Sequence, residues 1–174
     1  MKFCSDCAHP VAFEIPAGDH LPRYVCHACG TVHYQNPRII AGCIPTWEGK
    51  ILICKRAIEP RYGYWTLPAG FMENGEGVEH GAAREAQEEA LADVEISSLC
   101  AVVNVIKSNQ VHMLFRARLK NLDFGVGAES LEVKLVHPDD IPWAEIAFES
   151  VRFTLRRFLE DETTGKHRLH LHTI

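Results

Sequence analysis

Runs of apolar, β-branched residues along the chain predict its strands. Two such runs, residues 38–46 and 50–56, flank the short segment Trp47-Glu48-Gly49. Because a glycine-containing turn between two apolar runs is typical of a β-hairpin, these runs are expected to pair. Further strand-like runs follow at residues 94–105, 111–119 and 131–136.

Two other segments carry a helical pattern. Residues 78–91 are rich in Ala, Glu, Gln and Arg, which favour helix, and residues 148–160 repeat apolar side chains three or four positions apart. That apolar stripe consists of Val151, Leu155, Phe158 and Leu159. Residues 59–71, with two prolines and two glycines, are expected to form a loop. The order of strands and helices predicts a mixed α/β or α+β domain.

Composition limits the classes of protein that fit this pattern. A chain of 174 residues that is 47% hydrophobic suits one domain with a core and a small appendage, and it excludes wholesale disorder. The net charge of −5 argues against a general nucleic-acid binder, and no apolar run is long enough to span a membrane. The first residues have no apolar stretch typical of a secretory signal, so a cytoplasmic location is expected.

Four of the seven cysteines form two C-x-x-C pairs that lie 18 residues apart. They are Cys4 and Cys7, then Cys26 and Cys29. This spacing predicts one structural Zn²⁺ held by four thiolates; a redox dithiol would instead follow a strand of a βαβ unit. A nearby histidine in place of one cysteine is the remaining alternative. Residues 1–36 contain little else that could form a core, so the division expected is a metal-stabilised unit at 1–36, a larger domain at 37–162 and a frayed, solvated tail at 163–174.

The predicted helix at residues 78–91 carries a crowded acidic face. Glu85, Glu88 and Glu89 are three or four positions apart, so that their carboxylates share one side of the helix. Like charges at this spacing destabilise a helix unless a cation lies between them. A site for Mg²⁺, which prefers carboxylate oxygens, is one interpretation, and a solvated acidic helix is the other.

The glycines upstream favour the first interpretation, because the whole segment resembles the Nudix box, G-x5-E-x7-R-E-U-x-E-E-x-G-U. Gly70, Glu76, Arg84, Glu85, Glu88 and Glu89 lie at its fixed positions. Three residues depart from the family pattern: Ala69, Ala86 and Leu91, the last of which replaces a glycine that usually ends the helix. The resemblance implies the Nudix fold, an α/β/α sandwich with a mixed sheet, preceded here by a small four-cysteine zinc ribbon.

The resemblance also implies roles for individual residues. Glu85, Glu88 and Glu89 are similar to the family ligands of Mg²⁺ or Mn²⁺, joined by the backbone carbonyl of Gly70. Arg84 resembles the arginine that orients the catalytic glutamates, together with Glu76. The general base in this family is either a box glutamate or an acid on a later loop, where Glu129 is preferred to Glu132.

Enzymes of this family split the diphosphate of a nucleoside diphosphate linked to another group, by attack of water on phosphorus. Zinc-ribbon members include NADH pyrophosphatases, which carry an S-Q-P-W-P-F-P array that this chain lacks between residues 92 and 130. ADP-ribose, FAD or a similar molecule is therefore the expected substrate. Tyr64, Trp65 and Phe71 are candidates to stack on its base, although Trp65 and Phe71 suit a core equally well.

Two expectations concern partners. The resemblance makes a homodimer one expected assembly. The net charge and the lack of a long apolar run predict no nucleic acid and no membrane as partner. The alternative function is a zinc-ribbon nucleotide sensor or adaptor that binds without turnover, although the basic residues Lys2 and Arg23 are few for such a ribbon.

Overall fold

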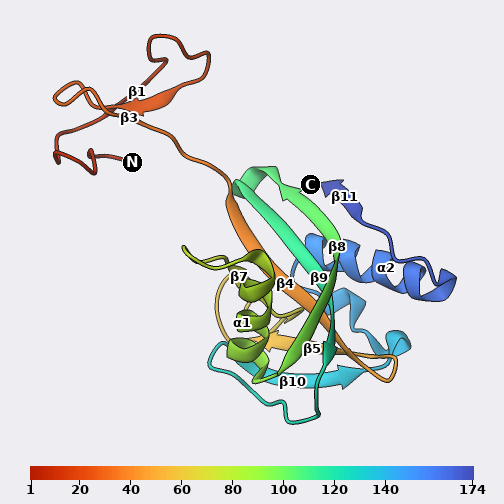
Figure 1. Ribbon diagram of the computed structural model, residues 1–174. Coiled ribbons are helices and arrows are strands. Elements are labelled where there is room, and N and C mark those ends of the chain that lie inside the picture. The colour runs from red at the N-terminus through yellow and green to blue at the C-terminus, as the bar shows by residue number, and fades with distance from the viewer. The chain divides into compact units, whose positions relative to one another are not determined.

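The computed structural model describes all 174 residues, and these form two compact units, Met1–Pro37 and Arg38–Ile174 (Figure 1). Each unit is described separately below. None of the helices combines the length and the apolar character that crossing a bilayer requires.

The first unit is a three-stranded antiparallel sheet. Its strands are β1 (Ala12–Glu14), β2 (Arg23–Val25) and β3 (Val32–His33). Only Cys4, Val25 and Cys26 in this unit are buried apolar residues. Such a small core cannot offset the conformational entropy of ordering the unit, which fits the expectation that a metal stabilises it.

The second unit is built on a mixed sheet. The order of its main strands is β10-β5-β4-β9-β8-β11. Their bounds are β4 (Arg38–Trp47), β5 (Lys50–Arg56), β8 (Val94–Val105), β9 (Gln110–Leu119), β10 (Ser130–Val136) and β11 (His170–Thr173). The predicted hairpin is confirmed as β4 and β5, which are antiparallel, whereas β4 and β9 run parallel. The three later strand predictions are confirmed as β8, β9 and β10.

The segment expected to be a loop at residues 59–71 contains two short strands. They are β6 (Trp65–Thr66), which pairs with β5, and β7 (Ala69–Phe71), which pairs with β4. Gly70 lies opposite Ala41 in the second pairing. This pairing fixes the glycine-rich segment beside the sheet, where a free loop had been expected.

Two helices cover opposite faces of the sheet, as Figure 1 shows. The helix α1 (Val78–Ala90) buries small residues such as Ala86 in a core that includes Cys43 of β4. The helix α2 (Glu149–Thr164) buries larger residues such as Leu155 in a second core that includes Ile44 of β4. Because successive strand residues point to opposite faces, the two cores lie on either side of the sheet. Single turns of 3₁₀ helix occur at Ile106–Ser108, Pro138–Asp140 and Trp143–Glu145. The predicted α/β/α sandwich is confirmed.

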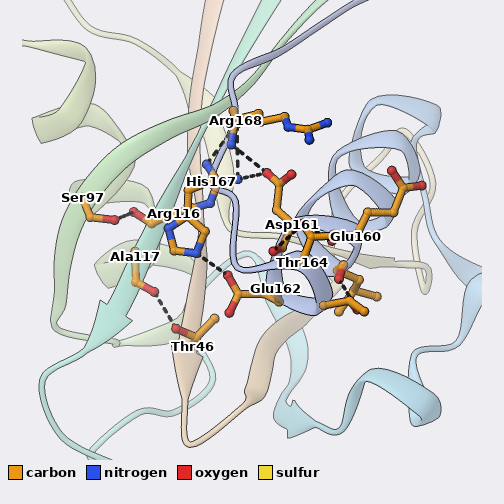
Figure 2. Close-up of polar contacts among 12 residues, drawn as sticks. Thr46, Ser97, Arg116, Ala117, Glu160, Asp161, Glu162, Thr164, His167 and Arg168 are labelled. Atoms are coloured by element: carbon orange, nitrogen blue, oxygen red, sulfur yellow. Dashed lines mark hydrogen bonds and ion pairs between the residues drawn. The ribbon is translucent and has the colours of Figure 1, made fainter.

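The end of the chain is ordered, contrary to the expectation of a frayed tail. Strand β11 pairs in parallel with β8. A buried cluster fixes the segment before it, and Figure 2 shows Arg116 of β9 and the backbone of Arg168 meeting at Asp161 of α2. The Asp161 carboxylate also accepts a hydrogen bond from His170 Nε2 at 2.9 Å. Contacts between distant parts of the chain therefore order this segment, which its own sequence could not indicate.

Candidate active site and metal centre

The four cysteines of the C-x-x-C pairs converge in the first unit. Their sulfur atoms all lie within 4.8 Å of one another, with Cys4 3.7 Å from Cys29 and Cys7 3.4 Å from Cys26. A tetrahedral Zn²⁺ with Zn–S bonds of about 2.3 Å places its sulfurs about 3.8 Å apart. The donor set therefore fits a zinc ion.

Tight turns and one histidine support this arrangement. The Cys4 carbonyl accepts a hydrogen bond from the amide of Ala8, and the Cys26 carbonyl accepts one from the amide of Gly30, so each pair of cysteines lies on a closed turn. His33 Nε2 lies 3.2 Å from Cys4 Sγ. A hydrogen bond from the imidazole to this sulfur would hold a metal-bound thiolate in place, while the four cysteines supply the clustered donor atoms.

In the second unit, Arg84 connects the carboxylates of the acidic helix. Its guanidinium donates two hydrogen bonds to Glu76, at 3.1 and 2.9 Å. It also donates to Glu85 and to Glu88, each at 2.8 Å, and to the carbonyl of Phe71 at 3.0 Å. These contacts from Arg84 hold the pKa of Glu76 at about 2, well below its usual range. One arginine thus fixes three carboxylates and the backbone of β7 in a single arrangement.

Burial makes the negative charges of this site costly. Glu85 and Glu89 are buried, at 8% and 5% exposed, whereas Glu88 is exposed. Desolvation, followed by the nearby charge of Glu85, raises the pKa of Glu89 to about 8. Desolvation raises the pKa of Glu85 as well. A divalent cation between these groups would offset both the burial and the repulsion, so the donor set fits Mg²⁺ or Mn²⁺.

Gly70 lets the backbone of β7 approach the same carboxylates. A Cβ atom built at Gly70 would lie 2.4 Å from the carboxyl group of Glu85. The adjacent amide of Ala69 donates a hydrogen bond to Glu89 Oε2 at 3.3 Å. Both contacts bring the Gly70 peptide against the acidic face of α1, the place that the resemblance implies for a backbone ligand.

A cavity of about 740 Å³ opens over this face of α1. Its lining includes Arg84, the three box glutamates and Glu129, whereas Glu132 lies outside it on the exposed side of β10. The loop that carries Glu129 is held against the helix, because the amide of Gly127 donates to the carbonyl of Glu89 at 3.1 Å. The structure therefore brings Glu129 to the acidic cluster from a segment 40 residues farther along the chain.

The three candidate aromatic residues have different environments. Phe71 lines the cavity and is 47% exposed, with the guanidinium of Arg38 4.7 Å from its ring centre. Trp65 is 3% exposed and belongs to the core under α2, as the alternative interpretation had it. Tyr64 is at the surface beside Arg61 and does not line the cavity. Only Phe71 is placed to contact a ligand there.

Several residues that line the cavity are not indicated as site residues by the sequence. Arg56, at the end of β5, is buried, and its charge lowers the pKa of Glu89 against the larger effect of desolvation. Gln110, His112 and Ser150 line the cavity from β9 and α2. These are isolated polar residues within or beside apolar runs, and only the pairing of distant strands and helices brings them together.

Comparison with known proteins matches both units. A zinc-ribbon family model described as Nudix N-terminal matches residues 2–35, and the NUDIX domain model matches residues 36–161. The crystal structure of a NUDIX hydrolase from Nitrosomonas europaea is 55% identical, with a TM-score of 0.97 over 100% of this chain and 99% of that one.

Two curated proteins are more distant relatives. The NAD-capped RNA hydrolase NudC of Stutzerimonas stutzeri is 27% identical over 162 residues, which cover 91% of this chain and 56% of that protein. The ADP-ribose pyrophosphatase of Methanocaldococcus jannaschii is 38% identical over 69 residues, 40% of this chain and 41% of that protein. The chain thus spans about half the length of these curated relatives.

Proposed function

The chain belongs to the NUDIX family, and from that premise we propose that it hydrolyses the diphosphate bond of a nucleoside diphosphate linked to a second group, with ADP-ribose and FAD as first candidates. The observation that carries the proposal is the cavity in which the carboxylates of Glu85, Glu88, Glu89 and Glu129 meet. In the reaction, the oxygen of water binds to one phosphorus as the bond from that phosphorus to the bridging oxygen breaks. Two monophosphates result, one of which is AMP for either candidate.

Glu85, Glu88 and Glu89 are the proposed ligands of Mg²⁺ or Mn²⁺, with the Gly70 carbonyl as a further ligand. A divalent ion bound there would neutralise the diphosphate oxygens and lower the pKa of a bound water. Arg84 keeps the carboxylates in place through its contacts with Glu85 and Glu88. It neutralises only part of their charge, which leaves the site attractive to a cation.

Glu129 is the proposed general base. It lines the same cavity as the box glutamates, and its charge contributes to the raised pKa of both Glu85 and Glu89, so its carboxylate lies close to theirs. In this role Glu129 accepts the proton that water loses as it attacks phosphorus.

Arg56 and Phe71 are proposed to contact the substrate directly. Arg56 donates its Nε hydrogen to the carbonyl of Pro60 at 2.9 Å, which leaves its two terminal nitrogens to meet a phosphate group. The half-exposed ring of Phe71 offers a surface on which a base can stack. Trp65 and Tyr64 have no part in this proposal, because neither lines the cavity.

A substrate panel tests the proposed reaction. The purified protein is incubated with Mg²⁺ or Mn²⁺ and ADP-ribose, FAD, NADH, NAD, CoA, NAD-capped RNA, diadenosine polyphosphates or nucleoside triphosphates, and the products are identified. Release of AMP from ADP-ribose or FAD is expected. Preference for a nucleoside triphosphate, with release of pyrophosphate, would contradict the linked-diphosphate reaction. Tight binding of one compound without turnover would favour the sensor function instead.

Glu88→Gln tests the metal assignment. The change keeps the side-chain volume, and Glu88 is exposed, so the fold should persist. Turnover should fall by about a thousandfold, since a lost ligand charge removes several kcal/mol of transition-state stabilisation. Glu79→Gln is the matched control, because Glu79 is exposed on the first turn of α1 outside the cavity. Near-wild-type turnover of the Glu88 variant at saturating Mg²⁺ would show that this carboxylate is not a ligand.

A further inference from the structure

The cavity has a second end, away from the box glutamates, which Gln110 and His112 of β9 line together with Glu149 and Ser150 at the start of α2. Three strands form its floor, because Ile40 of β4 lies in register with Phe71 of β7 on one side and with His112 of β9 on the other. All three residues line the cavity. Neighbouring strands are about 4.8 Å apart, so His112 lies about 10 Å from the glycine-rich segment that holds the acidic end.

Two hydrogen bonds fix the His112 ring in this second end. Its Nε2 lies 3.2 Å from Gln110 Oε1, and its Nδ1 lies 3.0 Å from Ser150 Oγ. An amide oxygen can only accept, so Nε2 carries the hydrogen, and Nδ1 then accepts from the hydroxyl of Ser150. Ser150 is itself 1% exposed at the start of α2, which makes it a rigid support for the ring.

This network leaves Gln110 with unused donors. The Gln110 carbonyl is bound to His112, so both hydrogens of its side-chain amide remain for another group, and Gln110 lines the cavity. Burial lowers the pKa of His112, so the ring is neutral and the network carries no charge near pH 7. Ile40, Leu114 and Val151 line the cavity beside it. A few fixed polar groups on an apolar wall are typical of a site that orients an uncharged organic ligand.

We propose that Gln110 determines substrate specificity by donating hydrogen bonds to the base or sugar of the substrate, and that His112 and Ser150 are positioning residues that aim its amide. The proposal rests on the proposed function, because it assigns the two ends of one cavity to the two parts of one substrate. The diphosphate lies at the acidic end beside Arg84, and the uncharged hydrogen-bonding group lies between β9 and the start of α2.

Steady-state kinetics of Gln110→Leu and Ser150→Ala with ADP-ribose and FAD test these roles. Loss of one or two hydrogen bonds to the substrate should raise KM about fivefold to tenfold for Gln110→Leu and less for Ser150→Ala, with kcat within about twofold of wild type. Gln35→Leu is the matched control, because Gln35 is an exposed glutamine of the first unit, and it should leave both constants unchanged. A fall in kcat with unchanged KM would overturn the proposal.

Binding without turnover separates this inference from the proposed function. Calorimetry with AMP and with inorganic pyrophosphate, in buffer without added Mg²⁺, needs no hydrolysis. Gln110→Leu should weaken AMP binding about fivefold to tenfold and leave pyrophosphate binding unchanged, since pyrophosphate has no base or sugar.

Unchanged AMP affinity in the variant would refute the role of Gln110 even if the wild type hydrolyses ADP-ribose. Weakened AMP affinity in a protein that hydrolyses nothing would support that role while the proposed function fails. Ribose 5-phosphate as a further ligand, which has the sugar and phosphate of AMP without its base, distinguishes contact with the base from contact with the sugar.

Discussion

Leu91 shows how one residue can depart from a family motif without changing its site. It stands where the Nudix box has glycine, yet its φ of 51° and ψ of 26° are left-handed, as glycine would be there. Its amide donates to the carbonyl of Gln87 at 3.0 Å, so α1 ends in the usual capped form. A left-handed conformation costs a leucine about 1 kcal/mol. The substitution therefore affects stability, while the acidic face one turn earlier keeps its geometry.

Gly70 is a position at which the site depends on the absence of a side chain. Gly70→Ala would place a methyl group 2.4 Å from the Glu85 carboxyl group, which would have to move away from its position beside Arg84. We expect activity to fall by about a hundredfold, because a displacement near 1 Å at a catalytic group has an effect of that order. The measurement is kcat/KM with the substrate that the panel identifies.

Gly77→Ala is the control for this substitution. A Cβ atom at Gly77 would make only ordinary contacts, at 3.7 Å, with side-chain atoms of Glu79 and His80. Its φ of −77° suits any residue. Equal losses of activity in the two variants would show that the segment tolerates no substitution at all, and that the contact with Glu85 is not the cause.

At the scale of elements, the sequence predicted what depends on local pattern. Long apolar runs gave β4, β5, β8, β9 and β10, and the helix pattern gave α1 and α2 within a few residues of their bounds. The short strands β6 and β7 were missed, because two or three residues among prolines and glycines carry no periodicity. Each of them forms because it pairs with a long neighbouring strand, β6 with β5 and β7 with β4.

In the candidate site too, local sequence patterns indicate some residues, whereas only the fold brings the others together. The acidic face of α1 follows from helical spacing, and the motif spacing indicates Arg84 and Gly70. The contact between His112 and Ser150 joins residues 38 positions apart on different elements, and no local pattern encodes it. Trp65 is a residue whose role the sequence left open, since an aromatic residue beside a glycine-rich segment suits a core as well as a ligand site. Its exposure of only 3% in the structure places it in the core.

The segment after α2 depends on one buried carboxylate. Asp161→Asn would leave the buried Arg116 without its counter-charge, and it would weaken the contacts to Arg168 and His170. We expect the free energy of unfolding of the second unit to fall by about 3 kcal/mol at pH 7, the usual cost of removing one partner from a buried pair. Urea unfolding followed by tryptophan fluorescence measures this change.

At acidic pH, the difference in the free energy of unfolding between Asp161→Asn and the wild type should become smaller. Burial alone would raise the pKa of Asp161, but hydrogen bonds from His170 and the Arg168 amide, and the charges of His170 and Arg116, hold it below its usual range. A pKa that is lower in the folded state gives stability that is present above about pH 4 and is lost as the pH falls through the folded value. Glu160→Gln is the control, since Glu160 is exposed and its partner Arg157 is half-exposed, and it should change stability by less than about 0.5 kcal/mol. Equal effects of the two variants would contradict the role of Asp161.

At the scale of the whole molecule, the two units are stabilised by different means. The second unit has two apolar cores, one on each face of its sheet, and every residue of both cores lies beyond position 38. The first unit has three buried apolar residues, two of which are cysteines of the four-cysteine cluster. All three tryptophans, at positions 47, 65 and 143, belong to the second unit. Tryptophan fluorescence therefore reports the second unit alone, while metal analysis for the expected zinc would report the first.

Cys26→Ser should separate the two units experimentally. A serine hydroxyl binds Zn²⁺ far more weakly than a thiolate, so the variant should lose the single zinc ion that the wild type is expected to retain through dialysis, and residues 1–37 should unfold with it. The tryptophan unfolding transition and the hydrolysis of the panel substrate should stay close to wild type, because neither core contains a residue of the ribbon.

Cys100→Ser is the matched control with the opposite pattern. It keeps the zinc but places a hydroxyl in the core at a position that is 0% exposed, which should lower the stability of the second unit by about 1–3 kcal/mol. Metal analysis and fluorescence on the same samples give both readouts. Loss of hydrolysis in the Cys26 variant with an unchanged tryptophan transition would mean that the zinc unit contributes to the reaction as well as to its own fold.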